Sequence, residues 1–124
     1  MHLSYDAFAD LAFAALDDLP AQIRGWLENV EVVVEDWPTR DQLRSAGVPR
    51  HETLFGLYEG VPLTERASDY GMVLPDKVTL FRGPILDACE SPAEVADEVR
   101  RTVIHELAHH FGIDDDRLVE LDRY

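Results

Sequence analysis

The segment from Ser91 to Gly112 most limits what this chain can fold into, because it carries the marks of one long helix. It opens with SPAE, in which Ser91 can cap the helix, Pro92 suits the first helical position and Glu94 completes a capping box. Apolar side chains then recur at helical spacing, and Gly112 can adopt the left-handed conformation that ends a helix. The apolar stripe consists of Val95, Val99, Val103, Leu107 and Phe111.

Three more helices are expected earlier in the chain. The first has Ser4 as its cap. Pro20 can open a short second helix through AQIRGWLEN, and TRDQLRSAG predicts a third between a Thr39 cap and Gly47. The first helix presents one apolar face, made of Phe8, Leu11, Ala12, Ala15 and Leu16.

Three segments have strand patterns. A β-branched run at Val30–Asp36 predicts a buried strand, Glu52–Gly60 alternates in part, and Lys77–Gly83 alternates cleanly. The stretch VPLTERASDYGMVLPD, with two Pro and one Gly, is expected to be a long loop. Helices and strands in mixed order, without regular alternation, indicate an α+β fold. A chain of 124 residues is expected to form one domain, residues 1–124.

Composition excludes several kinds of partner. The chain has 11 Lys and Arg against 25 Asp and Glu, for a formal net charge of −14, which argues against nucleic acid and membrane surfaces as partners. Its longest apolar run near the N-terminus, Leu11–Leu16, is too short to span a bilayer, and no basic leader precedes it. The single cysteine, Cys89, cannot form an internal disulfide and is expected in the core. These features favour a cytoplasmic location.

The end of the long helix carries the candidate chemistry, in the string HELAHHFGIDDD. His105 and His109 are four residues apart, so one helical turn places both imidazoles on the same face, where they can bind one zinc ion. Glu106 lies beside them and can act as a general base on a metal-bound water. Gly112 allows the chain to turn sharply, so that Asp115 can return to the ion as a third ligand.

Each of these assignments has a plainer alternative. The motif can match by chance on a charged helix, although its flanking features favour a metal site. Asp115, with its two Asp neighbours, can instead cap a last helix over DRLVELDRY. His110 points about 100° away from His109 around the helix, so a supporting role is expected. Four side chains are candidates for stabilising an oxyanion, namely Tyr58, Arg66, Tyr70 and Arg82. For each of them the alternative is a packing or surface role.

The motif HELAHHFGIDD resembles that of the zincin metallopeptidases, and its spacing is similar to a metzincin motif with Asp in place of the third His. With RRTVIHELAHHFGIDD, VEVVVED, LFGLYEGVPLTER and VTLFRGPIL, the chain from about Val30 onward resembles the small bacterial zincin-like metallopeptidases. The resemblance implies a minimal zincin-like domain, a short mixed sheet packed on the motif helix. It further implies zinc bound by His105, His109 and Asp115, with Glu106 as base. Unlike larger metzincins, the chain has no Met after Asp115.

The sequence therefore predicts a zinc-dependent metallopeptidase-like hydrolase that acts on a peptide or protein substrate. An extended substrate is expected to pair with the edge of the strand Lys77–Arg82, just before the motif helix. Two other classes of function stay open. One is a non-catalytic domain stabilised by zinc, and the other is a protein-interaction module with a vestigial site.

Overall fold

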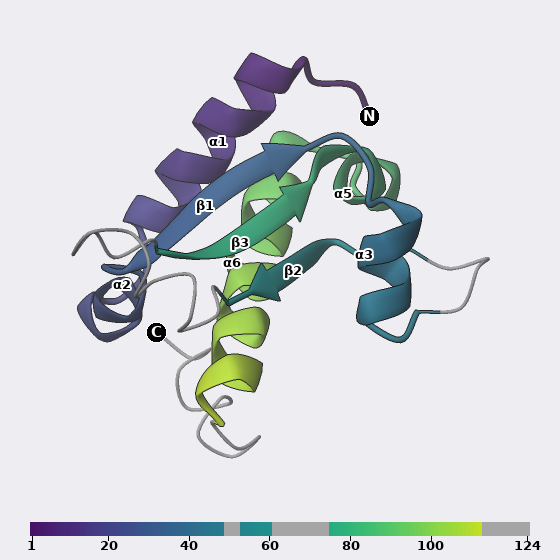
Figure 1. The fold of residues 1–124 in the computed structure, drawn as a ribbon. Coiled ribbons are helices and arrows are strands. Elements are labelled where there is room, and N and C mark those ends of the chain that lie inside the picture. Colours follow the sequence, from purple (N-terminus) through teal and green to yellow (C-terminus); the bar gives the residue numbers. More distant parts are fainter. Residues whose placement is uncertain (49–52, 61–74, 113–124) are drawn as a thin grey trace.

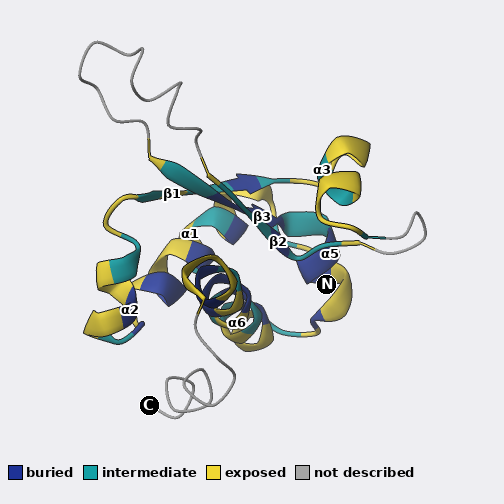
Figure 2. Ribbon diagram, turned by 60° about the horizontal axis from the view of Figure 1, so that its bottom comes forward, coloured by how far each residue is buried: buried dark blue, intermediate teal, exposed yellow. Residues whose placement is uncertain are grey.

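The computed structural model describes residues 1–48, 53–60 and 75–112, which contain five helices and three strands. Helices α1 (Tyr5–Asp17) and α6 (Pro92–Phe111) pack against each other and cover the same face of the sheet (Figures 1 and 2). The helices α2 (Ala21–Trp26) and α3 (Arg40–Ser45) lie toward opposite ends of the sheet. The expected α+β fold, with a small mixed sheet packed on the motif helix, is confirmed.

The sheet has the strand order β1-β3-β2, with β1 at Val30–Glu35, β2 at Gly56–Glu59 and β3 at Asp76–Phe81. Strand β3 runs parallel to β1 and antiparallel to β2. The expectation that Lys77–Arg82 offers a free edge to a peptide is therefore wrong, because β3 is the central strand. Its last four residues are all buried, which is typical of a strand covered on both faces.

Other strand predictions need correction in detail. Strand β1 lies at an edge of the described sheet, and Val34 is its one buried residue, so the strand is less buried than expected. Strand β2 is shorter than its predicted segment. The third predicted strand ends at Phe81, where a helix that the sequence did not indicate begins, α5 (Arg82–Ala88). Pro84 suits the first turn of this helix, and Cys89, which follows it, is buried as expected.

Helix α6 forms as its sequence predicts. The Ser91 hydroxyl accepts a hydrogen bond from the Glu94 amide at 3.2 Å, and Gly112 ends the helix at φ 67°. The capping box is only half formed, because the Glu94 carboxylate accepts from the amide of Glu90 at 2.7 Å. Four of the five stripe residues are fully buried, but Phe111 is 49% exposed and lies at the helix end beside the ring of Trp26.

The earlier helices are also capped as predicted. Ser4 accepts from the Ala7 amide at 3.2 Å, and Thr39 and Gln42 form a reciprocal capping box. Leu11 is only partly buried, whereas the rest of its predicted face belongs to the core. The core joins α1, α2, the sheet, α5 and α6, and its largest fully buried members include Phe8, Ile23, Val78, Leu80, Ile85, Val95, Val99, Val103 and Leu107.

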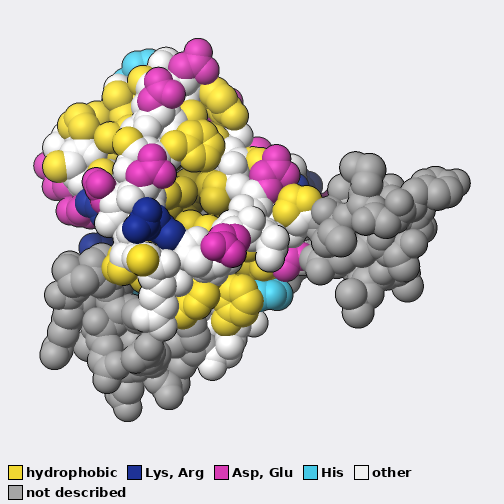
Figure 3. Space-filling view, turned by 90° about the vertical axis from the view of Figure 1, so that its left-hand side faces the viewer, with side chains coloured by type: hydrophobic (Ala, Val, Ile, Leu, Met, Phe, Trp, Pro, Cys, Tyr) yellow, Lys and Arg dark blue, Asp and Glu magenta, His cyan; other side chains and the backbone are white. Residues whose placement is uncertain are grey.

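The side of the molecule on which α1 and α2 lie carries more acidic than basic side chains, interspersed with hydrophobic ones (Figure 3). This distribution agrees with the formal net charge of −14. None of the described helices is long and apolar enough to cross a membrane.

Strand β2 approaches α6 closely at Gly56. A Cβ atom added there would lie 2.6 Å from the Cγ2 atom of Thr102 and 3.1 Å from the carbonyl oxygen of Thr79. Thr102 is itself almost fully buried, so its methyl group has little room to move. The absence of a side chain at Gly56 thus sets how near the strand can lie to the helix that carries the motif.

Substituting Gly56→Ala is expected to lower the free energy of unfolding by about 1–3 kcal/mol, because the added methyl group overpacks this contact. Thr102→Ser removes the clashing Cγ2 atom and keeps the hydroxyl, so the double variant should regain part of the loss. Urea denaturation of the wild type, both single variants and the double variant measures this. A Gly56→Ala protein as stable as the wild type would contradict the close contact.

Candidate functional site

The motif residues lie in the last turns of α6. His105 and His109 are both exposed, while their neighbours Ile104 and Ala108 are buried against the core. The burial of one side of the helix therefore determines that both imidazoles face solvent, one turn apart. Two neutral imidazoles at this spacing can bind a single metal ion such as zinc.

Glu106 is a residue of α6 whose side chain is partly buried on the side of the helix that faces β2. Burial raises the pKa of its carboxyl group above the ordinary value, while the backbone amide of Tyr58 and the nearby His109 and His105 act in the opposite direction. The Tyr58 amide therefore lies close enough to the Glu106 carboxylate to favour its charged form. A glutamate with a raised pKa is better matched to proton transfer near neutral pH than an exposed one.

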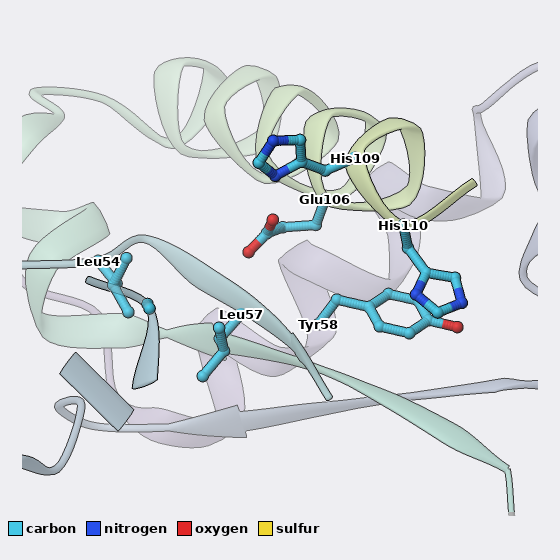
Figure 4. Close-up of a pocket in the computed structure, with 7 residues that line it drawn as sticks. Leu54, Leu57, Tyr58, Glu106, His109 and His110 are labelled. Atoms are coloured by element: carbon cyan, nitrogen blue, oxygen red, sulfur yellow. The ribbon is translucent and has the colours of Figure 1, made fainter. Parts of the chain in front are cut away.

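Two cavities meet at Glu106. The larger, of about 540 Å³, lies on the side of His109 and has apolar walls from Leu54 and Leu57. In Figure 4 the Glu106 carboxylate projects from α6 toward these leucines, with the His109 ring above it on the helix. The smaller cavity, of about 340 Å³, lies on the side of His105. Glu106 is thus reachable from both sides, next to each histidine.

His110 belongs to a different group of side chains. Its ring stacks on that of Tyr58, with centroids 3.9 Å apart and an interplanar angle of 16° (Figure 4). The Tyr58 hydroxyl donates to Asp76 Oδ2 at 2.6 Å, and His110 Nε2 lies 3.8 Å from the same oxygen. This arrangement fits the supporting role expected for His110. Asp76 had no signal in the sequence, because only strand pairing brings it to Tyr58.

The candidates for stabilising an oxyanion fare differently. Arg82 Nε donates to Asp36 Oδ1 at 2.8 Å and its Nη1 donates to the Leu3 carbonyl, which ties α5 to β1 and the N-terminus. This is the packing role weighed against catalysis for Arg82. The Tyr58 hydroxyl is bonded to Asp76. Arg66 and Tyr70 lie outside the described residues.

The predicted zinc site is only partly within the described residues. Over residues 1–48, 53–60 and 75–112, no group of three or more His, Cys, Asp or Glu side chains is placed to hold a metal ion. The third predicted ligand, Asp115, lies outside these ranges, as does the helix predicted over DRLVELDRY. The donor chemistry that is described, two exposed imidazoles one turn apart, fits two of the three ligands that a catalytic zinc takes from protein.

Comparison with known proteins bears on the family. A family model described as zincin-like metallopeptidase matches residues 27–124. Among solved structures, a conserved hypothetical protein from Thermo thermophilus is similar, with a TM-score of 0.56 and 24% sequence identity over 88% of this chain and 94% of that one. At this identity the likeness shows a shared fold alone. No curated protein matches the chain significantly.

Proposed function

The chain belongs to the zincin-like metallopeptidase family, and from this premise we propose that it is a zinc-dependent peptidase with Glu106 as its general base. One observation carries the proposal: Glu106 is partly buried between two cavities, each of which is also lined by one of the two candidate ligands, His109 and His105. A proton acceptor, two metal donors and space for a substrate therefore occur together at the end of α6.

In this proposal His105, His109 and Asp115 hold the zinc ion. Zinc, when bound, would polarise the scissile carbonyl and lower the pKa of a coordinated water. The two histidines must be neutral to serve as ligands, and both are exposed one turn apart on α6. The carboxylate of Asp115 would add negative charge beside the two neutral imidazoles.

Glu106 accepts the proton of the attacking water and passes it to the leaving amine. Its partial burial supports this role, because desolvation raises its pKa toward the range in which a carboxylate is an effective base. In this proposal the amide of Tyr58 takes one acceptor position of the carboxylate. A carboxylate has about four such positions, so the others stay available to a proton.

The substrate is proposed to bind along the edge strand β2 and not along β3, which is the central strand. Within the described residues, β2 is an edge strand, and it borders both cavities at Gly56, Leu57 and Tyr58. An extended peptide can add to such an edge through main-chain hydrogen bonds with backbone groups of β2 other than the Tyr58 amide. The cavity beside His109 has apolar walls, so it can take an apolar substrate side chain next to the cleaved bond.

A non-catalytic zinc-stabilised domain is the main alternative. A structural zinc site closes all four coordination positions with protein side chains, whereas a catalytic site leaves one open. The cavities on both sides of Glu106 support the open kind of site. Single-domain organisation over residues 1–124, a cytoplasmic location and a peptide or protein substrate stay predictions.

Metal removal tests the proposal. Protein purified without chelator is expected to contain about one zinc per chain and to cleave members of a peptide library. A chelator should abolish cleavage and lower the melting temperature, because metal binding adds to the stability of the folded state. Re-addition of zinc should restore both. Zinc-loaded protein that cleaves nothing would favour the zinc-stabilised alternative, and protein without zinc would favour the vestigial site.

A further inference from the structure

We infer that Tyr58 is a positioning residue that fixes the carboxylate of Glu106 through its backbone amide, while its side chain is anchored to His110 and Asp76. The inference deepens the proposed function, since it rests on Glu106 as base. It concerns a residue on β2 whose contacts reach α6 and β3 at once.

The pairing of β2 with β3 determines where the Tyr58 amide points. The Phe81 amide donates to the Phe55 carbonyl at 2.9 Å, and the register continues from this pair with Gly56 opposite Leu80 and Tyr58 opposite Val78. In an antiparallel ladder, hydrogen-bonded and non-hydrogen-bonded pairs alternate. Gly56 and Tyr58 therefore fall at non-hydrogen-bonded positions. Their amides point away from β3, and the Tyr58 amide lies close enough to Glu106 to act on its carboxylate.

The distance between successive residues on one face of α6 matches the distance between successive residues on one face of β2. Thr102, Glu106 and His110 are four residues apart along one face of the helix, which is about 6 Å per step. Two residues along a strand span about 6.6 Å. Gly56 therefore lies against Thr102 while Tyr58 lies against the next two members of the face. One strand residue can thus bond Glu106 through its amide and stack on His110 through its ring.

Asp76 anchors the other end of the Tyr58 side chain. Its carboxylate, on β3, accepts a hydrogen bond from the Tyr58 hydroxyl at 2.6 Å, a distance typical of a strong O–H···O⁻ bond. The ring of Tyr58 is thereby held between α6 and β3. With the side chain held, the backbone of Tyr58 has little freedom, and its amide presents a fixed donor to Glu106. A held carboxylate loses less rotamer freedom when it meets the reacting water.

Amide hydrogen exchange tests this contact without any need for activity. The Tyr58 amide should exchange at least about tenfold faster in Glu106→Ala than in the wild type, because its acceptor is gone. Glu106→Gln keeps an acceptor oxygen and should keep most of the protection. The amides of Leu57 and Glu59, which face β3, should be unchanged and serve as internal controls. Unchanged exchange of the Tyr58 amide in Glu106→Ala would overturn the inference.

Turnover by the zinc-loaded protein tests the anchor. Tyr58→Phe keeps the stacked ring but loses the hydroxyl, so kcat should fall about three- to tenfold with KM and zinc content unchanged. Asp76→Ala should have the same effect, Asp76→Asn should restore most of kcat, and the double variant Tyr58→Phe with Asp76→Ala should be no slower than either alone. A kcat equal to that of the wild type in all of these variants would overturn the anchoring role.

The two tests separate this inference from the proposed function. If the wild type cleaves no peptide while the Tyr58 amide responds to Glu106→Ala, the peptidase proposal fails and the contact is supported. If the wild type cleaves peptides while that amide does not respond, the peptidase proposal is supported and Tyr58 is not the residue that holds its base.

Discussion

Glu106→Gln is expected to leave zinc bound and to reduce kcat by about a hundredfold or more. Glutamine has nearly the shape of glutamate, and its side-chain oxygen can still accept the hydrogen bond that we infer from the Tyr58 amide. It cannot take a proton from water at neutral pH, so the step proposed for Glu106 loses its acceptor. Metal analysis of the purified variant and steady-state kinetics on a peptide cleaved by the wild type measure both parts of this result.

A control is needed for the loss of one negative charge on α6. Asp97 is an exposed carboxylate on the same helix, paired with Arg100 at 2.6 Å, and it lines neither cavity. Asp97→Asn removes the same charge and should change kcat by less than about twofold, since exposed ion pairs contribute little. A Glu106→Gln protein that turns over as fast as this control would remove Glu106 as the base.

The sequence predicted the parts of the fold that depend on local signals. Helix α6 follows from a cap, a proline, an apolar stripe and a terminal glycine, all of which act within a few residues. The predictions that failed depend on what lies across from each segment. The predicted strand at Lys77–Arg82 was expected to offer an edge to a peptide, but it is central in the sheet, because the order of strands cannot be derived from one strand.

The candidate site likewise combines residues whose positions follow from local spacing with residues that only strand pairing brings together. The positions of His105, Glu106 and His109 on α6 follow from helical spacing alone. The sequence indicated Tyr58 only as one of four candidates for stabilising an oxyanion, and nothing in it marked Asp76. They meet because β2 and β3 pair in one particular register, and 18 residues separate them in the chain. No local pattern specifies such a contact.

Asp115→Ala is expected to weaken zinc binding by more than about a hundredfold, because two histidines would remain where a catalytic site takes three protein ligands. Asp115→His should restore tight binding, since an imidazole at this spacing completes a three-histidine set. These results follow from the proposed ligand role, which rests on the position of Asp115 three residues after Gly112. The described end of α6 supports the first step of that path, because Gly112 adopts the left-handed conformation that turns the chain out of the helix.

The alternative, in which Asp115 caps a following helix, predicts a different pattern across the same variants. Asp115→Asn would then be nearly neutral, since asparagine caps as well as aspartate, and Asp115→Ala would cost about 1 kcal/mol of stability. Zinc affinity would hardly change in any of the three. Titration of zinc into metal-free wild type and the Ala, Asn and His variants, with thermal unfolding of each, separates the two roles. A metal-free Asp115→Ala protein that binds zinc as tightly as the wild type would exclude Asp115 as a ligand, and the third donor would have to lie elsewhere in the chain.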